Sequence, residues 1–571
     1  MNSLVGTIPD GFGNLTELVH LDMMQNSFHG SIPGQLFRLT NLRSLDLSTN
    51  SLEGEVPPEL GSFRNLTTLR LNINGFHGVL TPEVGKLRNL ESLKLNGNFL
   101  SGSIPEEIGD LTRLTEFSLG KNKFSGGIPS SIVKLKELQS LDLSANSFSV
   151  QIPAVIGRLS NITTLDLSYN RFMGPMPSTL QNLSKLETLR LQNNNLTGEI
   201  PTWLFEIETL NKLLIGGKGN NLIWNNKAKI VPRCWLEQIS MTSCKISGQI
   251  PQWISSQTGL NFLDLSDNQL EGRFPDWLAE MDVNGSIIPS DNDIKGNLQD
   301  IIPQTPTLEV LSLRNNSFEG FIPRTISNLS SLRILDLSRN KLTGSIPQEI
   351  GNLARMIETP VTSTSGYRFP SDLLFQMNNP YINPDIILEV QDLIVNWKNS
   401  FQGLASRNLG IYSFLDLSDN RISGEVPTSL GNLKDLKVLN ISHNNISGNI
   451  PESFGNLKGV ESLDLSHNRI AGSIPQSLTK LDELAIFDVS DNRLKGKIPV
   501  GGQMNTMNEL KYFANNSGLC GMQIRVRCPE DIPPSEGEEE NDEKQSWMSW
   551  EGAWIGFAVG LFSSILMMAT H

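Results

Sequence analysis

The sequence predicts a solenoid of short coils that stack side by side into one long domain. Three observations predict it: a fixed repeat, an alternating apolar pattern inside each repeat, and a recurring Gly-x-Ile-Pro segment. One residue, nearly always asparagine, recurs mostly at steps of 24 residues, with a 26-residue step before Asn220 and an interruption after Asn340. Its register runs through Asn2, Asn26, Asn50, Asn74, Asn98, Asn122, Asn146, Asn170, Asn194, Asn220, Cys244, Asn268, Asn292, Asn316, Asn340, Asn420, Asn444, Asn468 and Asn492. Because one such unit cannot bury its apolar edge alone, we expect about 19 coils to share a continuous core.

Each coil begins with a short strand, as residues 90–113 illustrate. Leu93 and Leu95 alternate with Lys94 and Asn96, which is the period of two that marks a strand with one buried face. Successive strands should therefore line one concave parallel sheet. Asn98 follows the strand, where its amide can satisfy backbone groups that a buried turn would otherwise leave unpaired.

The second half of each coil carries the Gly-x-Ile-Pro segment, seen at residues 102–105. Glycine tolerates positive φ, and proline fixes φ and cannot donate to a ladder of hydrogen bonds. The complete pattern, LxxLxLxxNxLxGxIP, resembles the plant-type extracellular leucine-rich repeat, in which cysteine is a recognised substitute for the asparagine. That resemblance implies an α/β solenoid that twists into a superhelix.

Composition argues against nucleic acid and against catalysis. The net charge is −14, without a basic stripe to neutralise phosphates. The six histidines have no metal-ligand spacing, and the glycines of residues 216–219 lack the context of a phosphate-binding loop. We therefore expect no enzyme activity, no metal and no cofactor.

Sequons and cysteines favour a secreted chain. Eleven N-x-[ST] sequons are candidate glycosylation sites, at Asn14, Asn65, Asn161, Asn182, Asn195, Asn284, Asn315, Asn328, Asn440, Asn445 and Asn515. Cys520 and Cys528 follow the last coil, where a short disulfide loop would close the apolar end of the stack. Cys234 and Cys244 flank one predicted strand, which places their Cα atoms too far apart to bridge.

Both ends of the chain raise expectations about the membrane. Met1 enters in the middle of a repeat without a leader or a cap, so we expect a truncated gene model or a fragment whose full-length parent carries a signal peptide and a cap; a functional cytosolic protein is the alternative. Residues 552–570 are uncharged and mostly apolar, long enough to form one transmembrane helix; a cleaved lipid-anchor signal is the alternative. Gly552, Gly556 and Gly560 would form a small-residue stripe for helix pairing, although small residues are common in membrane helices.

Residues 356–411 interrupt the repeats without having the composition of a linker. Their tyrosines, phenylalanines and one tryptophan supply enough apolar bulk to pack, so we expect a folded island.

The whole layout resembles the plant receptor-like proteins, which are cell-surface receptors without a kinase. Particular matches are LDLSDNRISGEVP from Leu415 and SGLCG before Cys528. The resemblance implies a single-pass plasma-membrane protein that pairs with an adaptor receptor kinase through its helix and with a co-receptor kinase through its island and last repeats. Family islands often carry a lysine followed six residues later by tyrosine; here Leu404 follows Lys398, which departs from that pattern. The implied segments are repeats 1–355, island 356–411, repeats 412–505, cysteine-pair cap 506–529, acidic juxtamembrane segment 530–549 and transmembrane helix 550–571.

Strands that depart from the common LDLS text are candidates for ligand binding. Arg70, Lys94 and Arg190 replace the aspartate, and a basic patch would favour an acidic or sugar-rich ligand. The alternative is neutral variation on a solvated face. The complete set of candidates is Arg70, Asn72, Lys94, Asn96, Glu116, Lys121, Glu187, Arg190 and Gln192.

A second candidate surface lies on the last four coils. Four residues share one register position there and should form a column with a spacing of ~4.8 Å. Because histidine titrates near pH 6.5, an acidic medium would charge this column, unless the histidines are merely interchangeable turn residues. With the island, the candidates for co-receptor docking are Trp397, Lys398, Asp419, His443, His467 and Asp491.

The sequence thus favours a membrane-anchored receptor for an extracellular peptide, protein or glycan, in immunity or development. A secreted inhibitor of cell-wall-degrading enzymes and a nonfunctional truncated product are the alternatives.

Overall fold

The computed structural model describes residues 4–225, 229–302, 305–358 and 412–529, together with the backbone of 391–397 and 400–405. The chain divides into two units, Met1–Val526 and Arg527–His571, and the described part of the second unit is residues 527–529.

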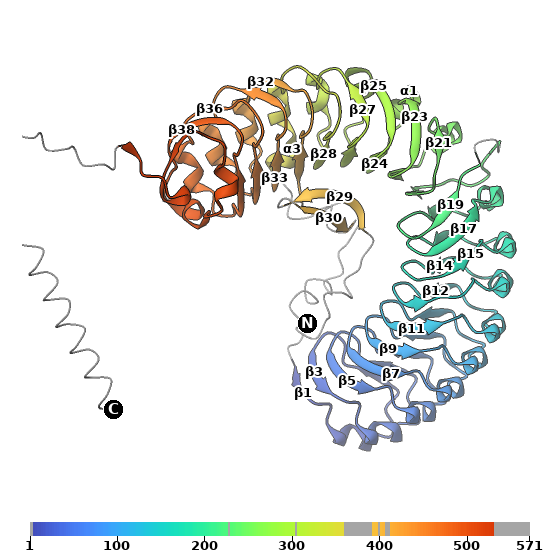
Figure 1. The fold of residues 1–571 in the computed structure, drawn as a ribbon. Coiled ribbons are helices and arrows are strands. Elements are labelled where there is room, and N and C mark those ends of the chain that lie inside the picture. The colour runs from blue at the N-terminus through green and yellow to red at the C-terminus, as the bar shows by residue number, and fades with distance from the viewer. Residues whose placement is uncertain are drawn as a thin grey trace, which may run out of the picture. The chain divides into compact units, whose positions relative to one another are not determined.

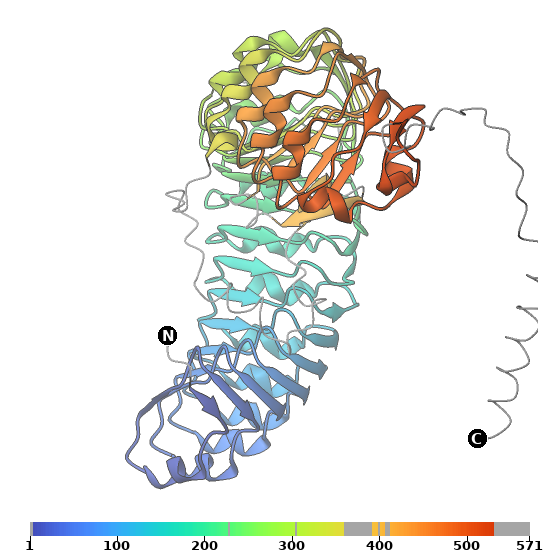
Figure 2. The ribbon, with the colours of Figure 1, turned by 90° about the vertical axis from the view of Figure 1, so that its left-hand side faces the viewer.

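A parallel ladder of 18 short strands runs in chain order through the first unit. This confirms the predicted concave parallel sheet, since the strands line the inner side of the arc (Figure 1). Figure 2 shows the first coils from the side and the last coils more nearly end-on, so the ladder twists as it curves. The strands are β2 (His20–Asp22), β4 (Ser44–Asp46), β6 (Thr68–Arg70), β8 (Ser92–Lys94), β10 (Glu116–Ser118), β12 (Ser140–Asp142), β14 (Thr164–Asp166), β16 (Thr188–Arg190), β18 (Lys212–Leu214), β20 (Gln238–Ser240), β22 (Phe262–Asp264), β24 (Ser286–Ile288), β26 (Val310–Ser312), β28 (Ile334–Asp336), β31 (Phe414–Asp416), β33 (Val438–Asn440), β35 (Ser462–Asp464) and β37 (Ile486–Asp488).

The ladder asparagine joins each coil to the one before it. The Nδ2 of Asn98 donates to Leu71 O of the preceding coil and to Leu95 O of its own coil, each at 3.0 Å, and its Oδ1 accepts from Phe76 N at 3.1 Å. These bonds satisfy backbone groups at a buried turn, as the sequence predicts. Asn516 makes the same set of bonds one period beyond Asn492, a continuation that the sequence prediction missed.

A second set of short parallel strands follows the asparagines, on the flank of the stack. The sequence did not predict these strands, because the proline of the Gly-x-Ile-Pro segment cannot donate to a ladder of hydrogen bonds and no second strand was expected near it. They are β1 (Val5–Gly6), β3 (Ser27–Gly30), β5 (Ser51–Glu55), β7 (Gly75–Val79), β9 (Phe99–Gly102), β11 (Lys123–Gly126), β13 (Ser147–Phe148), β15 (Met173–Gly174), β17 (Asn195–Glu199), β19 (Asn221–Ile223), β21 (Ser247–Gly248), β23 (Gln269–Arg273), β25 (Asp293–Asn297), β27 (Ser317–Glu319), β32 (Ser423–Glu425), β34 (Asn445–Ser447), β36 (Ala471–Gly472), β38 (Arg493–Lys497) and β39 (Gly518–Cys520). Gly102 pairs within this ladder at φ +81°, and Pro105 comes after it, at the start of the next helix.

Most outer segments are single turns of 3-10 helix, so the helical half of the predicted α/β solenoid is tighter than an α-helix. They are η1 (Asp10–Asn14), η2 (Gly34–Arg38), η3 (Pro58–Ser62), η4 (Pro82–Lys86), η5 (Glu106–Asp110), η6 (Ser130–Lys134), η7 (Ala154–Arg158), η8 (Ser178–Asn182), η9 (Thr202–Glu206), η10 (Gln252–Ser256), η11 (Arg324–Asn328), η12 (Gln348–Asn352), η15 (Thr428–Asn432), η16 (Glu452–Asn456), η17 (Gln476–Lys480), η18 (Gly502–Thr506), η19 (Leu510–Phe513) and η20 (Met522–Ile524). The α-helical turns are α1 (Asp276–Glu280), α2 (Leu298–Ile301) and α3 (Ala354–Ile357). Close packing explains the glycines here: a Cβ on Gly109 would lie 2.6 Å from the backbone oxygen of Ser131 in the next coil.

One core runs through the stack between the strands and the outer helices. Leu93 and Leu95 are at most 1% exposed, as their alternation predicts. Phenylalanines also stack from coil to coil: the ring centroids of Phe124 and Phe148 are 6.4 Å apart, and those of Phe148 and Phe172 are 5.8 Å apart. Each coil therefore completes the core of its neighbour.

The interruption leaves the ladder intact. β28 pairs directly with β31, and the Nδ2 of Asn420 donates to Leu337 O at 2.9 Å across the gap in sequence. Within the interruption, β29 (Gln391–Trp397) and β30 (Ser400–Ala405) form an antiparallel hairpin on the inner side of the arc (Figure 1). The inserted chain therefore leaves and re-enters the stack without costing a coil.

Candidate functional site

The inner face presents three side chains per coil, at six, four and two residues before the ladder asparagine. In the coil of Asn98 these are Ser92, Lys94 and Asn96, all half-buried, while the leucines between them point into the core. Because neighbouring strands pair without a shift in register, equivalent residues form columns along the face.

The predicted basic patch is neutralised by carboxylates on neighbouring strands. Lys94 Nζ lies 2.7 Å from Glu116 Oε1, and Arg70 Nη1 lies 3.5 Å from Asp46 Oδ2. Arg190 Nη1 lies 3.6 Å from Asp166 Oδ2. Each of these basic residues thus faces an acidic one 22 to 24 positions away in the sequence, so its charge is compensated within the inner face.

The other predicted ligand-binding residues lie in different settings. Asn72, Asn96 and Lys121 are half-buried on the inner side, and Lys121 takes a positive φ of 56°. Glu187 lies just before β16 and is exposed. Gln192 is different, because it is only 4% exposed and lines a hollow.

This hollow, of about 480 Å³, extends over seven coils of the inner face. Its residues come from the coils of β14, β16, β18, β20, β22, β24 and β26, and include Tyr169, Gln192, Lys218, Asp264, Asp267, Asp291 and Arg314. It lies where side chains on the face are short or apolar, such as Leu214, Gly216 and Ile288. Two extra residues also enter the repeat here, and Gly217 and Gly219 take φ of +92° and +97° around the exposed Lys218. Departure from LDLS and the 26-residue step were the sequence signals that could have located it.

The aspartates of the LDLS strands serve the fold. Asp416 Oδ1 accepts from Ser418 N at 2.9 Å and from Ser418 Oγ at 2.6 Å. Burial, together with the neighbouring carboxylate of Asp336, raises the pKa of Asp416 to about 8. Burial also raises the pKa of Asp166 to about 6. These carboxyl groups close the turn after the strand and face their neighbours along a column.

The second predicted surface forms a column of three exposed residues and the half-buried Asp491. Arg339 Nε lies 3.4 Å from Asp419 Oδ2 at one end. The rings of His443 and His467 stack with centroids 4.0 Å apart, and His467 Nε2 lies 3.4 Å from Asp491 Oδ2. All four predicted residues take φ between 51° and 53°, a left-handed conformation that aims each side chain along the same line.

An apolar stripe covers part of the same downstream face. Val310, Ile334, Phe414 and Val438, each the first residue of its strand, form a cluster with Ile288 that is separate from the main core. These side chains are at most 3% exposed, although their register places them on the inner face. The sequence analysis did not predict this stripe.

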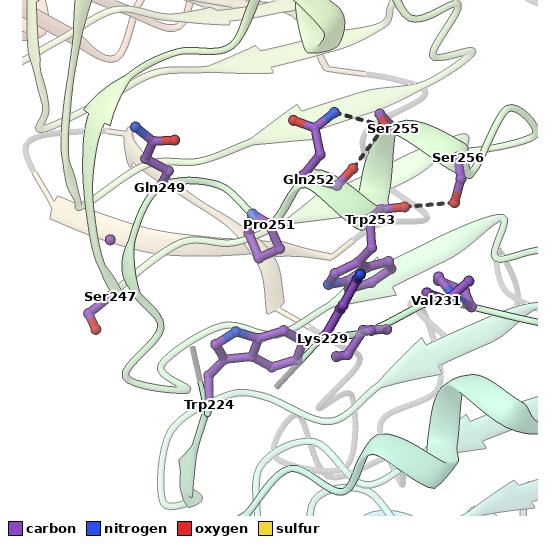
Figure 3. A pocket seen from close by; sticks show the side chains of 13 residues that line it. Trp224, Lys229, Val231, Ser247, Gln249, Pro251, Gln252, Trp253, Ser255 and Ser256 are labelled. Atoms are coloured by element: carbon purple, nitrogen blue, oxygen red, sulfur yellow. Dashed lines mark hydrogen bonds between the residues drawn. The ribbon is translucent and has the colours of Figure 1, made fainter. Parts of the chain in front are cut away.

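A pocket of about 620 Å³ opens on the flank, where the second ladder breaks between β19 and β21 (Figure 3). The indoles of Trp224 and Trp253 lie side by side there, with ring centroids 6.2 Å apart, beside Lys229 and Val231. Residues 221–243 lack the Gly-x-Ile-Pro segment, which explains the break. Cys244 replaces the asparagine at the same place, and its Sγ lies 3.4 Å from Thr242 O of its own coil.

The sequons differ in their accessibility. Ten of them are exposed or half-exposed. Asn440 is 3% exposed, with Nδ2 donating to Asp416 Oδ2 at 3.2 Å and Oδ1 accepting from Ser442 Oγ at 2.7 Å. A glycan on Asn440 is incompatible with this packing, so Asn440 is removed from the predicted glycosylation sites.

The cysteines fall into two classes. Cys520 and Cys528 are disulfide-bonded, and Cys234 and Cys244 are buried free thiols. Burial raises the pKa of the Cys234 thiol to about 11 and that of Cys244 further still. The free pair therefore consists of unreactive core residues in the folded state.

Several predicted site residues lie outside the description. Trp397 ends β29 with only its backbone described, and Lys398 lies outside the described residues. So do Gly552, Gly556 and Gly560, along with the rest of the predicted membrane helix. Among the residues that the structure describes, no helix is both long and apolar enough to cross a membrane.

Comparison with known proteins places the chain among repeat proteins of this geometry. A model described as a leucine-rich repeat region matches residues 47–282, and a leucine-rich-repeat model matches 291–356 and 413–470. The matched ranges lie in the solenoid on both sides of the interruption. Stacked coils with an inner parallel ladder and these matches define a leucine-rich-repeat protein.

Two relatives in the same plant indicate a family within the leucine-rich-repeat proteins. Receptor-like protein 46 of Arabidopsis thaliana is 60% identical over 201 residues, which is 33% of this chain and 24% of that protein. Receptor-like protein 50 of the same plant is 55% identical over 175 residues, covering 31% of this chain and 19% of that protein. The matched parts thus span about a quarter and a fifth of these relatives. The chain belongs to the plant leucine-rich-repeat receptor-like proteins.

Solved structures agree on the fold. The Arabidopsis receptor kinase HAESA, in complex with the peptide hormone IDA and the co-receptor SERK1, is 28% identical with a TM-score of 0.59, covering 91% of this chain and 85% of that one. The plant peptide hormone receptor RGFR1, in complex with RGF2, is 27% identical with a TM-score of 0.57 over the same shares.

Proposed function

We propose that this protein is a ligand-binding receptor of the plant cell surface whose inner face takes an extracellular ligand. The observation that carries the proposal is the inner face itself. It presents columns of side chains in register, and a hollow of about 480 Å³ crosses seven coils of it. A surface of this kind recognises an extended partner by many separate contacts, without a catalytic cleft.

The nature of the partners is proposed from the neighbours. Structures that this fold resembles hold peptide hormones, and one also holds a co-receptor. We therefore favour a peptide over a glycan as the ligand. Signalling would pass through a co-receptor kinase and an adaptor receptor kinase, in immunity or development.

The proposed docking surface for a co-receptor is chosen by its position in the last coils. The column of Asp419, His443, His467 and Asp491 lies in the last coils, close to the disulfide-bonded Cys520 in sequence and therefore to the proposed cap of residues 506–529. We propose that a co-receptor contacts this column together with Trp397 and Lys398 of the island. Exposed sequons would carry glycans on the flanks and rims of the stack.

The remaining segments are proposed from the sequence. Residues 530–549 would form an acidic juxtamembrane segment, and residues 550–571 would form one transmembrane helix with the repeats outside the cell. Gly552, Gly556 and Gly560 would contact the helix of the adaptor kinase.

Surface labelling of intact plant cells that express the full chain tests this proposal. An impermeant biotin reagent should label the repeats, and the protein should stay with the membrane fraction. Release of the mature chain into the medium would instead favour a secreted inhibitor, and protection from the reagent would contradict the receptor.

Co-purification tests the partner. A Gly556→Leu and Gly560→Leu double variant should reach the surface and lose most of the receptor kinase that co-purifies with the unchanged protein. Undiminished co-purification would remove the glycine stripe from the proposal and leave the receptor itself standing.

A further inference from the structure

Gln192 is a buried amide without a hydrogen-bond partner. The residue is 4% exposed, and neither its Nε2 nor its Oε1 is bonded to another group. Buried polar side chains are nearly always paired, because an unpaired one keeps the full cost of losing water. An amide in this state at the wall of a hollow is a group held ready for a ligand.

The repeat explains why Gln192 lacks a partner. In the preceding coil the equivalent residue, Ser168, donates its hydroxyl to Asp166 at 2.6 Å. In the coil of Gln192 the position of that aspartate is occupied by Arg190, which reaches back to Asp166 at 3.6 Å. In the next coil the equivalent residue, Gly216, has no side chain.

We propose that the hollow binds an extended peptide, and that the carboxamide of Gln192 pairs with one of its main-chain peptide units. This inference rests on the proposed function and specifies its ligand. A carboxamide offers one donor group and one acceptor group in a plane, which matches the N–H and C=O of an extended backbone. The match is independent of the ligand's side chains, so Gln192 anchors and does not select.

The dimensions suit such a ligand. At ~4.8 Å per strand, the six steps between seven coils extend over roughly 29 Å, which is the length of about nine residues in an extended conformation. The ligand would cross the strands of the ladder, so about three peptide residues would lie over every two coils.

Charge adds a preference for a basic side chain. Asp264, Asp267 and Asp291 line the hollow, together with the cations Lys218 and Arg314. Asp291 Oδ1 lies 3.6 Å from Arg314 Nη2, and Asp267 Oδ2 accepts from Ser243 Oγ at 2.6 Å. The carboxylates outnumber the cations, so a lysine or arginine of the peptide would be favoured in the middle coils.

A Gln192→Leu variant tests the role of the amide by two readouts that should move in opposite directions. Leucine has a similar volume and no polar atom, so it removes the unpaired group and should raise the melting temperature of the ligand-free protein. The same change should weaken peptide binding by about tenfold or more, as expected for two lost hydrogen bonds. The probe is an immobilised array of random synthetic ten-residue peptides, incubated with the purified full chain in detergent.

Gln151→Leu is the matched control, because Gln151 is exposed on the flank and lies outside the hollow. It should leave both readouts unchanged. Peptides bound by the unchanged protein should be enriched in lysine or arginine, and their binding should be measured again for each variant in solution.

The remaining outcomes separate the two proposals. Equal binding by Gln192→Leu would overturn the anchor while leaving the receptor in place. Weaker binding together with a lower melting temperature would show that Gln192 only packs the face. If the unchanged protein selects no peptide at all, the proposed peptide receptor fails together with this inference.

Discussion

The upstream and downstream parts of the inner ladder are built from one repeat and present different surfaces. On β6 to β16, the first and third residues of each strand are half-buried. On β24, β26, β28, β31, β33 and β35, all three residues are buried. The change in exposure occurs without any break in strand pairing.

The difference arises largely at one register position. Thr68, Ser92 and Glu116 open upstream strands, whereas Ile334 and Phe414 open downstream ones. The middle residue of the strand is leucine in most coils on both sides, with Phe117 and Ile287 as exceptions, so the core does not constrain what the face carries. A solenoid of this kind separates the residues that make it fold from those that decide what it touches.

The largest expected effect comes from placing a carboxylate on each surface. Ile334→Asp buries an unpaired charge at a side chain that is 0% exposed, and should lower the free energy of unfolding by more than about 3 kcal/mol. Thr164→Asp, at the same register position upstream, should stay within about 0.5 kcal/mol. Urea unfolding of both variants measures these changes. Equal losses in the free energy of unfolding would contradict the difference between the two surfaces.

A second prediction is that the asparagine hydrogen bonds between coils stabilise the fold equally beneath both surfaces. Asn98 and Asn468 each bond the coil before them through Nδ2 and Oδ1. Replacing either asparagine with alanine leaves buried backbone groups without a hydrogen-bond partner. The free energy of unfolding should fall by about 2–3 kcal/mol. The two costs should agree within about 0.5 kcal/mol, and Asn96→Ala should have little effect. Clearly different costs in urea unfolding would mean that the asparagine hydrogen bonds also differ between the two parts of the ladder.

The third prediction concerns pH. The pKa of Asp416 is raised to about 8, so the folded state binds its proton more tightly than the unfolded chain does. The stabilisation from this proton is fully present below about pH 4 and is lost as pH rises through 8. The melting temperature should therefore be several degrees higher at pH 5.5 than at pH 8.5. Asp416→Asn should flatten that slope, because Asn440 shows that an amide fits this column. An unchanged slope in thermal melts would contradict the assignment.

The smallest effect is expected for ion pairs on or beside the inner face. Lys94 and Glu116 lie 2.7 Å apart with 29% and 37% of their side chains exposed, whereas Lys437 and Glu461 lie 3.4 Å apart with 27% and 18% exposed. Double-mutant cycles should give the upstream pair about 0.2–1 kcal/mol of coupling, lost in 1 M salt. The downstream pair should be less sensitive to salt, and the opposite ranking would contradict the difference in burial.

The features that repeat with a strict period were predicted from the sequence. Asn98, Leu93 and Leu95 recur at fixed spacing, and their roles follow from geometry that every coil shares. The flank strands could not be found in the same way, because two to five residues around a positive-φ glycine give no clear alternation. The tight outer turns were equally hidden, since five residues carry too little pattern to separate a 3-10 turn from an α-helix.

The surface was harder to predict because it depends on neighbours one period away. Arg70 was taken as part of a basic patch, although Asp46 lies 24 positions before it and pairs with it. Reading the sequence in columns would have shown that pair. A column shows that Ile334 has apolar neighbours on adjacent strands, but its complete burial is seen only in the structure. The anchor role of Gln192 was also out of reach, since an unpaired amide is recognised only once its surroundings are known.

The break in the flank ladder leaves one step of the stack with fewer hydrogen bonds between neighbouring coils. Between β19 and β21 the outer strands do not continue into one another, and a cysteine stands where other coils have an asparagine. Local opening should therefore be easiest at this step, where the inner strands β18 and β20 hold the two halves together. Two thiols, Cys234 and Cys244, are sealed beside it. Their rate of alkylation in the native protein would report how often the two halves part, without any engineered label.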